Sequence, residues 1–186
     1  MNKIILLLAL ISQLTLFAQQ SSEKKVRDTL NISSINSVNI KEAAKYSQKK
    51  NTLLFTFASW CEPCHLHLPT AIKLAKDYDL DLYVVIIDPE NSEGMNYCAD
   101  YIYALDKSVK VAVLSDATYG VKPKKRNKQF ITEMTPPQFE NISDFSKYIV
   151  INKQGEVIMV TTWKDNKGDW RDDTKMVNER IVPLLQ

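Results

Sequence analysis

Two cysteines separated by two residues are the part of this sequence best suited to chemistry. Cys61 and Cys64 lie three positions apart, and Cys98 is the third cysteine of the chain. Thiol–disulfide exchange needs one thiolate that attacks a disulfide and a second thiol that resolves the mixed disulfide. A close pair with one remote cysteine fits a redox pair better than a structural framework of several disulfides. The sequence therefore predicts a redox-active disulfide between Cys61 and Cys64.

The segments on either side of the pair predict how it is positioned. Residues 53–58 form an apolar run of strand length, and a helical pattern of apolar residues extends from Leu66 to Ala75. The pair therefore lies at a helix N-terminus, where free N–H groups and the helix dipole favour a thiolate. We expect Cys61 to be the nucleophile and Cys64, one turn further along the helix, to be the resolving thiol.

The rest of the hydrophobic pattern alternates strands with helices. This order predicts an α/β fold in which helices cover both faces of a central mixed β-sheet. Residues 116–145 fit no regular element, and we interpret them as an irregular insertion before a C-terminal β-hairpin. The other expected elements are strands at 82–87 and 110–114, a hairpin of 148–151 with 157–160, and helices at 39–50, 92–106 and 174–185.

The first eighteen residues have the layout of a signal peptide. Lys3 precedes an apolar run that ends at Leu16, and polar residues follow from Gln19. The run is too short for a comfortable membrane span, although an uncleaved anchor remains an alternative because Leu16 is not small. We expect export, with the periplasm as the location and secretion as the alternative. The expected parts are a signal peptide at 1–18, a flexible lead-in at 19–35 and one functional domain at 36–186. An irregular first strand is the alternative for the lead-in.

The residues around the pair resemble a known superfamily. Residues 57–64, Phe-Ala-Ser-Trp-Cys-Glu-Pro-Cys, are similar to the active-site strand and turn of thioredoxin-like proteins, and Pro69 matches the proline of their active-site helix. With the signal peptide and the hairpin, the chain is most similar to exported bacterial thiol–disulfide oxidoreductases of the TlpA/ResA type. The resemblance implies a thioredoxin fold over 36–186, in which four residues shape the active site: Trp60, Glu62, Pro63 and Pro69.

Two positions depart from that family. Ser146 aligns with the family's cis-proline, which faces the cysteines, so Ser146 is expected to border the substrate groove. A cis bond before a residue other than proline costs about 2.5–4 kcal/mol, so we expect a trans bond there. Glu62 stands where thioredoxin has glycine, and its carboxylate disfavours a neighbouring thiolate. Both departures indicate an atypical member that acts as a reductase.

These features predict an enzyme that reduces disulfides of envelope proteins through the Cys61 and Cys64 dithiol. It needs no metal or organic cofactor, and its expected partners are disulfide-bearing envelope proteins and a membrane dithiol donor. The formal charge of +2 gives no reason to expect nucleic acid as a partner. No feature of the sequence requires an oligomer, so we expect a monomer. The alternatives are a non-catalytic thioredoxin-fold binding module and a copper chaperone that uses the same cysteines.

Several other residues have more than one interpretation. His65 completes the C-x-x-C-H pattern of haem attachment, which the preceding buried strand disfavours. His65 and His67 are two apart on a helix, so we interpret them as partly exposed surface residues rather than metal ligands. Cys98 is interpreted as a small buried residue, with a third redox partner as the alternative.

Two surface segments complete the set of candidates. The basic cluster at 122–128 is interpreted as a solvated loop, with docking of an acidic partner as the alternative. The tryptophans and acids between the hairpin and the last helix are interpreted as loop packing, with a carbohydrate or partner surface as the alternative. These residues are Trp163, Asp169, Trp170, Asp172 and Asp173.

Overall fold

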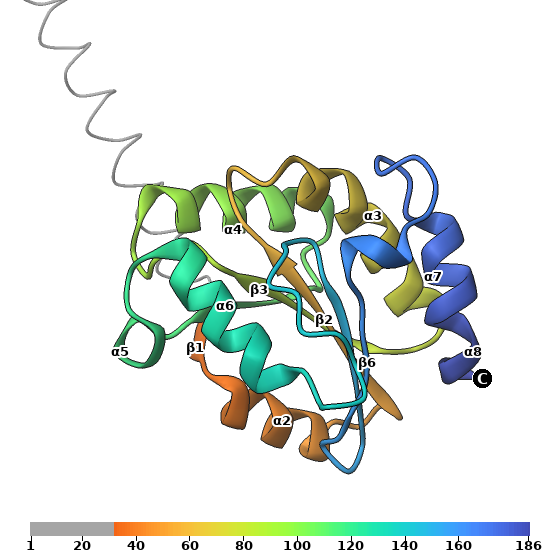
Figure 1. Ribbon diagram of the computed structural model, residues 1–186. Coiled ribbons are helices and arrows are strands. Elements are labelled where there is room, and N and C mark those ends of the chain that lie inside the picture. The colour runs from red at the N-terminus through yellow and green to blue at the C-terminus, as the bar shows by residue number, and fades with distance from the viewer. Residues whose placement is uncertain (1–31) are drawn as a thin grey trace, which may run out of the picture. The chain divides into compact units, whose positions relative to one another are not determined.

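The computed structural model describes residues 32–186, so the expected signal peptide at 1–18 lies outside the described residues. Six strands form one mixed sheet in the order β1–β4–β3–β2–β5–β6 (Figure 1). The first four strands of this order are parallel, whereas β5 runs antiparallel to β2 and β6 antiparallel to β5. Their bounds are β1 Ser33–Ile35, β2 Asn51–Phe57, β3 Asp81–Ile86, β4 Lys110–Leu114, β5 Tyr148–Asn152 and β6 Val157–Val160.

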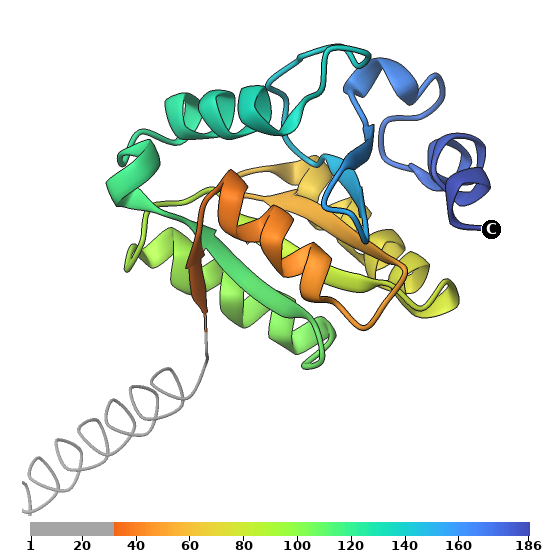
Figure 2. The same cartoon turned by 90° about the horizontal axis from the view of Figure 1, so that it is seen from below.

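Helices cover both faces of the sheet, as predicted. Helices α3 (Glu62–Asp77) and α4 (Glu93–Leu105) pack on one face against the parallel strands, while α2 (Ser37–Tyr46) and α6 (Pro123–Met134) lie together on the other (Figures 1 and 2). This strand order, with helices on both faces and a C-terminal antiparallel hairpin, is a thioredoxin-like α/β fold. The shorter elements are α5 (Asp116–Tyr119), the 3₁₀ helix η1 (Trp163–Asp165), α7 (Thr174–Arg180) and α8 (Val182–Leu185).

Strand β2 is the centre of the core. All seven of its residues are buried, because β3 and β5 flank it and helices cover both of its faces. Its register pairs Leu54 with Tyr83 on β3 and with Ile149 on β5. A continuous apolar run without alternation is what a strand covered on both faces requires. The strand predicted at 53–58 is therefore confirmed, and its carboxyl end leads directly to the two cysteines.

The prediction of an irregular segment at 116–145 is wrong, because α5 and α6 occupy much of it. Helix α6 docks through Phe130, Ile131 and Met134, which are fully buried. Arg126 is also fully buried, and its Nη1 lies 2.6 Å from Asp116 Oδ1. The apolar signal of this helix is weak because lysines crowd its solvent-facing side. The cluster at 122–128 is thus part of a helix that begins at Pro123, with four exposed lysines: Lys122, Lys124, Lys125 and Lys128.

The lead-in was expected to be either flexible or an irregular first strand, and its described end forms a strand. Residues Ser33–Ile35 are β1 and pair in parallel with β4. The C-terminal end of the domain differs from the prediction. The single helix predicted at 174–185 divides at Ile181 into α7 and α8. Pro183 explains the division, because it has no N–H to continue the hydrogen bonds of α7.

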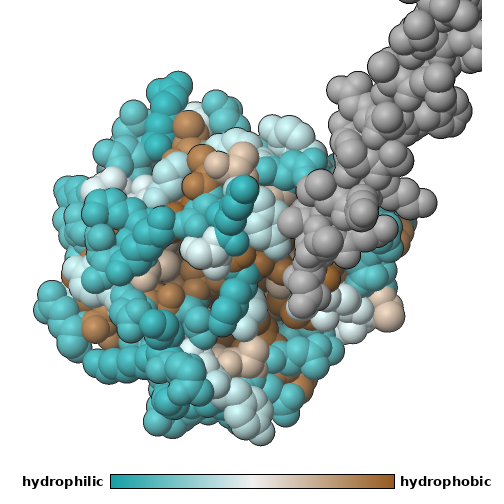
Figure 3. Space-filling view, turned by 180° about the vertical axis from the view of Figure 1, so that it is seen from behind, coloured by the Kyte–Doolittle hydropathy of each residue, from teal (hydrophilic) through white to brown (hydrophobic). Residues whose placement is uncertain are grey.

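The surface is mixed in character. The face seen from behind shows mostly hydrophilic residues with apolar residues exposed between them (Figure 3). Among residues 32–186, no helix has both the length and the apolar character needed to cross a membrane.

Docking of α6 can be tested by replacing Phe130 with alanine. We expect the free energy of unfolding to fall by about 3 kcal/mol, because the change leaves a cavity among fully buried side chains. Chemical denaturation followed by circular dichroism measures the loss. Lys128→Ala, on the exposed side of the same helix, is the matched control and should change stability by less than about 0.5 kcal/mol. Equal effects of the two variants would contradict a docked α6.

Candidate active site

Cys61 and Cys64 are joined by a disulfide at the start of α3. Cys61 is the N-cap of the helix, and the backbone N–H of Cys64 donates to its Sγ at 3.2 Å. Pro63 lies in the first turn, where a missing N–H costs nothing. Cys61 is 5% exposed and Cys64 is fully buried, so Cys61 is the more accessible sulfur of the pair. The arrangement matches the strand-to-helix position expected from the sequence.

A buried carboxylate anchors the chain just before the disulfide. Asp88, which follows β3 by two residues, accepts hydrogen bonds from the backbone N–H of Ser59 at 2.9 Å and from its hydroxyl at 2.7 Å. Helix α4 passes so close that a Cβ on Gly94 would come 2.2 Å from Asp88 Oδ1. Glycine at this position therefore allows α4 to approach the carboxylate that holds the active-site turn.

His65 supports the same turn from the side of α3. Its Nε2 lies 3.1 Å from the Ser59 carbonyl oxygen, to which it donates, and its ring packs edge-on against Phe57 and Tyr101. Pro69 cannot donate to the His65 carbonyl four residues earlier, and the Tyr101 hydroxyl donates to that oxygen instead at 3.4 Å. The proline within the helix is thus accommodated by a side chain of α4.

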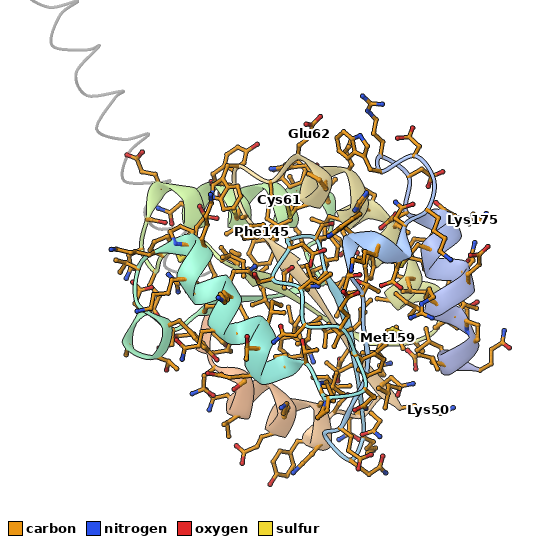
Figure 4. The ribbon with its side chains drawn as sticks, viewed as in Figure 1. Lys50, Cys61, Glu62, Phe145, Met159 and Lys175 are labelled. Atoms are coloured by element: carbon orange, nitrogen blue, oxygen red, sulfur yellow. A yellow bond between two sulfur atoms is a disulfide. The ribbon has the colours of Figure 1, made fainter. Side chains whose placement is uncertain are left out.

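A groove of about 470 Å³ opens beside the disulfide, and Cys61 lies in its wall. Trp60 is 51% exposed and packs edge-on against Phe145, with ring centroids 4.6 Å apart. Figure 4 shows Cys61 and Phe145 near each other, and Lys50 and Met159 towards the other end of the sheet. Trp163 and Trp170 add aromatic surface from the segment after β6. The groove is therefore largely apolar next to the more accessible sulfur.

Ser146 also lies in the wall of this groove. No peptide bond is cis within the part of the chain that the structure describes, so the trans bond expected before Ser146 is confirmed. The backbone of Ser146 has a φ of +60°, which is uncommon for a residue other than glycine. Its hydroxyl lies 2.8 Å from His67 Nδ1 and 3.4 Å from the Pro63 carbonyl oxygen. Ser146 thus bridges the loop before β5 and the start of α3.

The interpretation of both histidines as surface residues is wrong for His67, which is 8% exposed. His67 Nε2 lies 2.8 Å from the Trp170 carbonyl oxygen, and Nδ1 lies 3.8 Å from the buried Asp173 Oδ2. The Tyr148 hydroxyl donates to the same Asp173 oxygen. Burial, and then the charge of Asp173, raise the pKa of Tyr148, so its hydroxyl remains a donor at neutral pH.

The loop that carries Ser146 is held by a buried lysine. Lys147 Nζ donates to the Thr161 carbonyl oxygen at 2.6 Å and pairs with Asp144 at 2.5 Å. Burial lowers the pKa of Lys147, and the Asp144 carboxylate opposes that shift. Trp163 joins the same arrangement, because its backbone N–H donates to Asp144 at 2.7 Å. The two segments that flank the groove are therefore tied to each other.

Cys98 is fully buried in α4, and its Sγ lies 3.5 Å from Asp88 Oδ2. Burial, and then the charge of Asp88, raise the pKa of the Cys98 thiol. A thiol that cannot ionise near neutral pH is a poor nucleophile. The structure therefore agrees with the interpretation of Cys98 as a small buried residue.

The structure gathers the predicted active-site residues but adds others that sequence reasoning did not select. Trp60, Glu62, Pro63 and Ser146 lie with Cys61 around the groove, whereas Pro69 is exposed further along α3. Phe145 was not selected at all, and His67 was interpreted as a surface residue. Trp163, Trp170 and Asp173 were interpreted as loop packing, with a carbohydrate or partner surface as the alternative. The i, i+3 spacing of Cys64 and His67 was a signal that places them on one helix face.

Comparison with known proteins gives structural likeness only. No protein-family model matches the sequence, and no curated protein matches it. A thioredoxin-like protein from Aeropyrum pernix is 11% identical, with 89% of this chain and 99% of that chain covered and a TM-score of 0.49. The thioredoxin domain of a thiol-disulfide oxidoreductase from Bacteroides vulgatus is 16% identical, with 72% and 80% covered and a TM-score of 0.45.

A third solved structure is a thiol:disulfide interchange protein of the thioredoxin family from Chlorobium tepidum. It is 16% identical, with 75% of this chain and 83% of that chain covered and a TM-score of 0.45. The class of this protein follows from its own strand order and site. It is a thioredoxin-like fold with a Cys-x-x-Cys disulfide at the start of the helix that follows the central strand.

The state of Cys98 gives a direct prediction. The oxidised protein should show no thiol that reacts with Ellman's reagent while it is folded, because Cys98 is buried and its pKa is raised. Unfolding in guanidinium should release one reactive thiol per chain. Cys98→Ala is the control and should show none in either condition. Rapid reaction of a thiol in the folded, oxidised protein would contradict the burial of Cys98.

Proposed function

We propose that this chain is a thiol–disulfide oxidoreductase that reduces disulfide bonds in exported proteins of the cell envelope. The observation that carries the proposal is the position of the Cys61–Cys64 disulfide, whose more accessible sulfur lies in the wall of an apolar groove. A substrate disulfide that enters this groove meets Cys61 first, because Cys64 is fully buried. Access to one sulfur only is what a nucleophile and a resolving thiol require.

The proposed reaction moves two electrons from the protein to the substrate. The Cys61 thiolate attacks one sulfur of the substrate disulfide, and the other substrate sulfur leaves and takes up a proton. The Cys64 thiol then loses its proton and attacks the Cys61 sulfur. This step forms the Cys61–Cys64 disulfide and releases the second substrate thiol. A membrane dithiol donor would reduce the pair again for the next cycle.

Glu62, next to Cys61, biases the pair towards reduction of substrates. The helix N-terminus stabilises a thiolate, whereas the carboxylate of the adjacent Glu62 destabilises it. A less stable reduced form gives up its electrons more readily, which is the property of a reductase. The Trp-Cys-Glu-Pro-Cys sequence and the signal-peptide layout of residues 1–18 support the TlpA/ResA type and an envelope location.

The groove supplies the contacts for a polypeptide substrate. Trp60, Phe145 and Trp163 line it, and aromatic side chains are frequent energetic centres of protein interfaces. Trp60 and Trp163 are both more than half exposed, so the surface is available to a partner. We propose that apolar residues next to the substrate cysteine occupy this groove during exchange.

The activity can be tested by reduction of insulin disulfides with dithiothreitol as the electron source. We expect wild-type protein to accelerate the reaction and Cys61→Ser to abolish the acceleration, because the attacking sulfur is absent. After dithiothreitol is removed, reduced Cys64→Ser should instead form a mixed disulfide with insulin through Cys61 that persists, because the resolving thiol is absent. Mass spectrometry under non-reducing conditions detects this adduct.

Other results would identify the alternative function. A folded wild-type protein that shows no turnover, and whose disulfide resists reduction by dithiothreitol, would contradict the enzyme and favour a binding module with a structural disulfide. Turnover that survives in Cys61→Ser would assign the chemistry to another group.

The contribution of the groove can be tested with Trp163→Ala. We expect KM for reduction of a peptide disulfide flanked by apolar residues to rise about five-fold, which corresponds to about 1 kcal/mol of lost contact. Reactivity towards a small disulfide such as oxidised glutathione should change little, because it does not fill the groove. Tyr46→Ala, an exposed aromatic residue on α2, is the matched control and should leave KM unchanged. An unchanged KM in Trp163→Ala would remove the groove from substrate binding.

A further inference from the structure

The floor of the groove contains a hydrogen-bonded histidine that the exchange steps do not use. His67 Nε2 lies 2.8 Å from the Trp170 carbonyl oxygen, and Nδ1 lies 2.8 Å from Ser146 Oγ. A carbonyl oxygen can only accept, so Nε2 carries a hydrogen in the neutral and in the protonated ring. Nδ1 is therefore the atom whose protonation can change, and it faces Ser146.

The Ser146 hydroxyl connects Nδ1 with the turn that holds the cysteines. Its oxygen lies 3.4 Å from the Pro63 carbonyl oxygen, and Ser146 shares the wall of the groove with Cys61. A hydroxyl has one hydrogen to donate. When Nδ1 is unprotonated, it accepts this hydrogen from the Ser146 hydroxyl. When Nδ1 is protonated, His67 donates to Ser146, and the hydroxyl hydrogen is free to turn towards the Pro63 carbonyl oxygen. The N–H of that same peptide unit belongs to Cys64 and donates to Cys61 Sγ at 3.2 Å.

The loop geometry fixes Ser146 in this position. Its left-handed backbone, with a φ of +60°, costs of order 1 kcal/mol and persists only where surrounding contacts hold it. Lys147, the next residue, has a buried side chain that donates to the Thr161 carbonyl oxygen. The hydroxyl can therefore change its direction of donation without a movement of the backbone.

The charged groups around His67 are mainly carboxylates. Asp173 is the nearest, with Oδ2 at 3.8 Å from Nδ1, and it is buried and bonded to the Tyr148 hydroxyl of β5. Asp172 is exposed in the same C-terminal segment. The remaining charges at the groove are Glu62 at the start of α3 and Asp144, which is paired with Lys147.

We infer that His67 is a positioning residue whose protonation, relayed through the Ser146 hydroxyl, stabilises the Cys61 thiolate of the reduced protein. The inference rests on the proposed oxidoreductase function. The reduced state then holds a Cys61 thiolate, a Cys64 thiol and a protonated His67. Reduction of one substrate disulfide transfers two electrons from the cysteine pair and two protons, one from Cys64 and one from His67. The products are two substrate thiols, the Cys61–Cys64 disulfide and a neutral His67.

The test compares wild-type protein with His67→Asn. An asparagine amide can replace Nδ1 as a hydrogen-bond partner of Ser146, but it cannot be protonated in this range. Histidine is the side chain that ordinarily changes its charge between pH 5 and 8. The measurement is the rate at which iodoacetamide alkylates Cys61 in the reduced protein across that range, with the site identified by mass spectrometry. We expect Cys61 of the wild type to react about five-fold faster than in the variant at pH 6, and the two rates to converge by pH 8.

A second variant keeps the test decisive if His67→Asn does not fold, which circular dichroism would show. Ser146→Ala removes the relay and leaves His67 in place, so its Cys61 should also lose reactivity at pH 6 relative to wild type. Coincident pH profiles of the wild type and either folded variant would overturn the inference.

Equilibration of each protein with dithiothreitol distinguishes failure of the His67 inference from failure of the proposed oxidoreductase function. If the wild-type disulfide exchanges with dithiothreitol but the pH profiles coincide, only the role of His67 is overturned. If the wild-type disulfide does not exchange at any pH, the oxidoreductase function is overturned together with the inference. If exchange occurs and the profiles differ as expected, the ratio of the wild-type to the variant exchange constant should also change with pH. The titration of dithiothreitol affects both proteins equally and cancels in this ratio, so the remaining change comes from the substituted residue.

Discussion

The complete burial of β2 is the constraint on which the site depends. Because β2 is covered on both faces and paired on both edges, the chain becomes accessible only beyond the end of the strand. The turn that contains Ser59 and Trp60 follows directly after that end. The turn becomes the first turn of α3, with Cys61 as its N-cap. Asp88 and His65 hold Ser59 from two sides. The position of the disulfide is thus set by the core rather than by a free loop.

Besides the active-site turn and α3, two segments far from the disulfide in the sequence line the groove. The loop before β5 supplies Phe145 and Ser146, and the segment after β6 supplies Trp163 and Trp170. Lys147 and Asp144 join these two segments through buried polar contacts. Burying a lysine is costly unless it is paired, and here Lys147 has the Asp144 carboxylate and the Thr161 carbonyl oxygen as partners. This cost is consistent with a loop whose position matters for function.

A proton-sensitive histidine in such a groove would connect two properties that thiol exchange needs. The reduced protein must hold a reactive thiolate, and the products must receive two protons. His67 serves both purposes in the proposed cycle, because its charge opposes that of the thiolate and its proton is released on oxidation. Glu62 acts in the opposite direction by destabilising the thiolate. The balance between these two residues would set the reducing strength at a given pH.

The sequence by itself determined the α/β class, the central strand and the reactive pair, because each rests on local pattern: an uninterrupted apolar run, a change to helical period and the spacing of Cys61 and Cys64. It failed for α6, whose buried Arg126 and exposed lysines conceal a docked helix. Only the tertiary structure decided the groove and the partners of His67. Ser146, Trp170 and Asp173 lie 79, 103 and 106 positions away from it in the sequence, and polar contacts across such separations leave no periodic signal in a single chain.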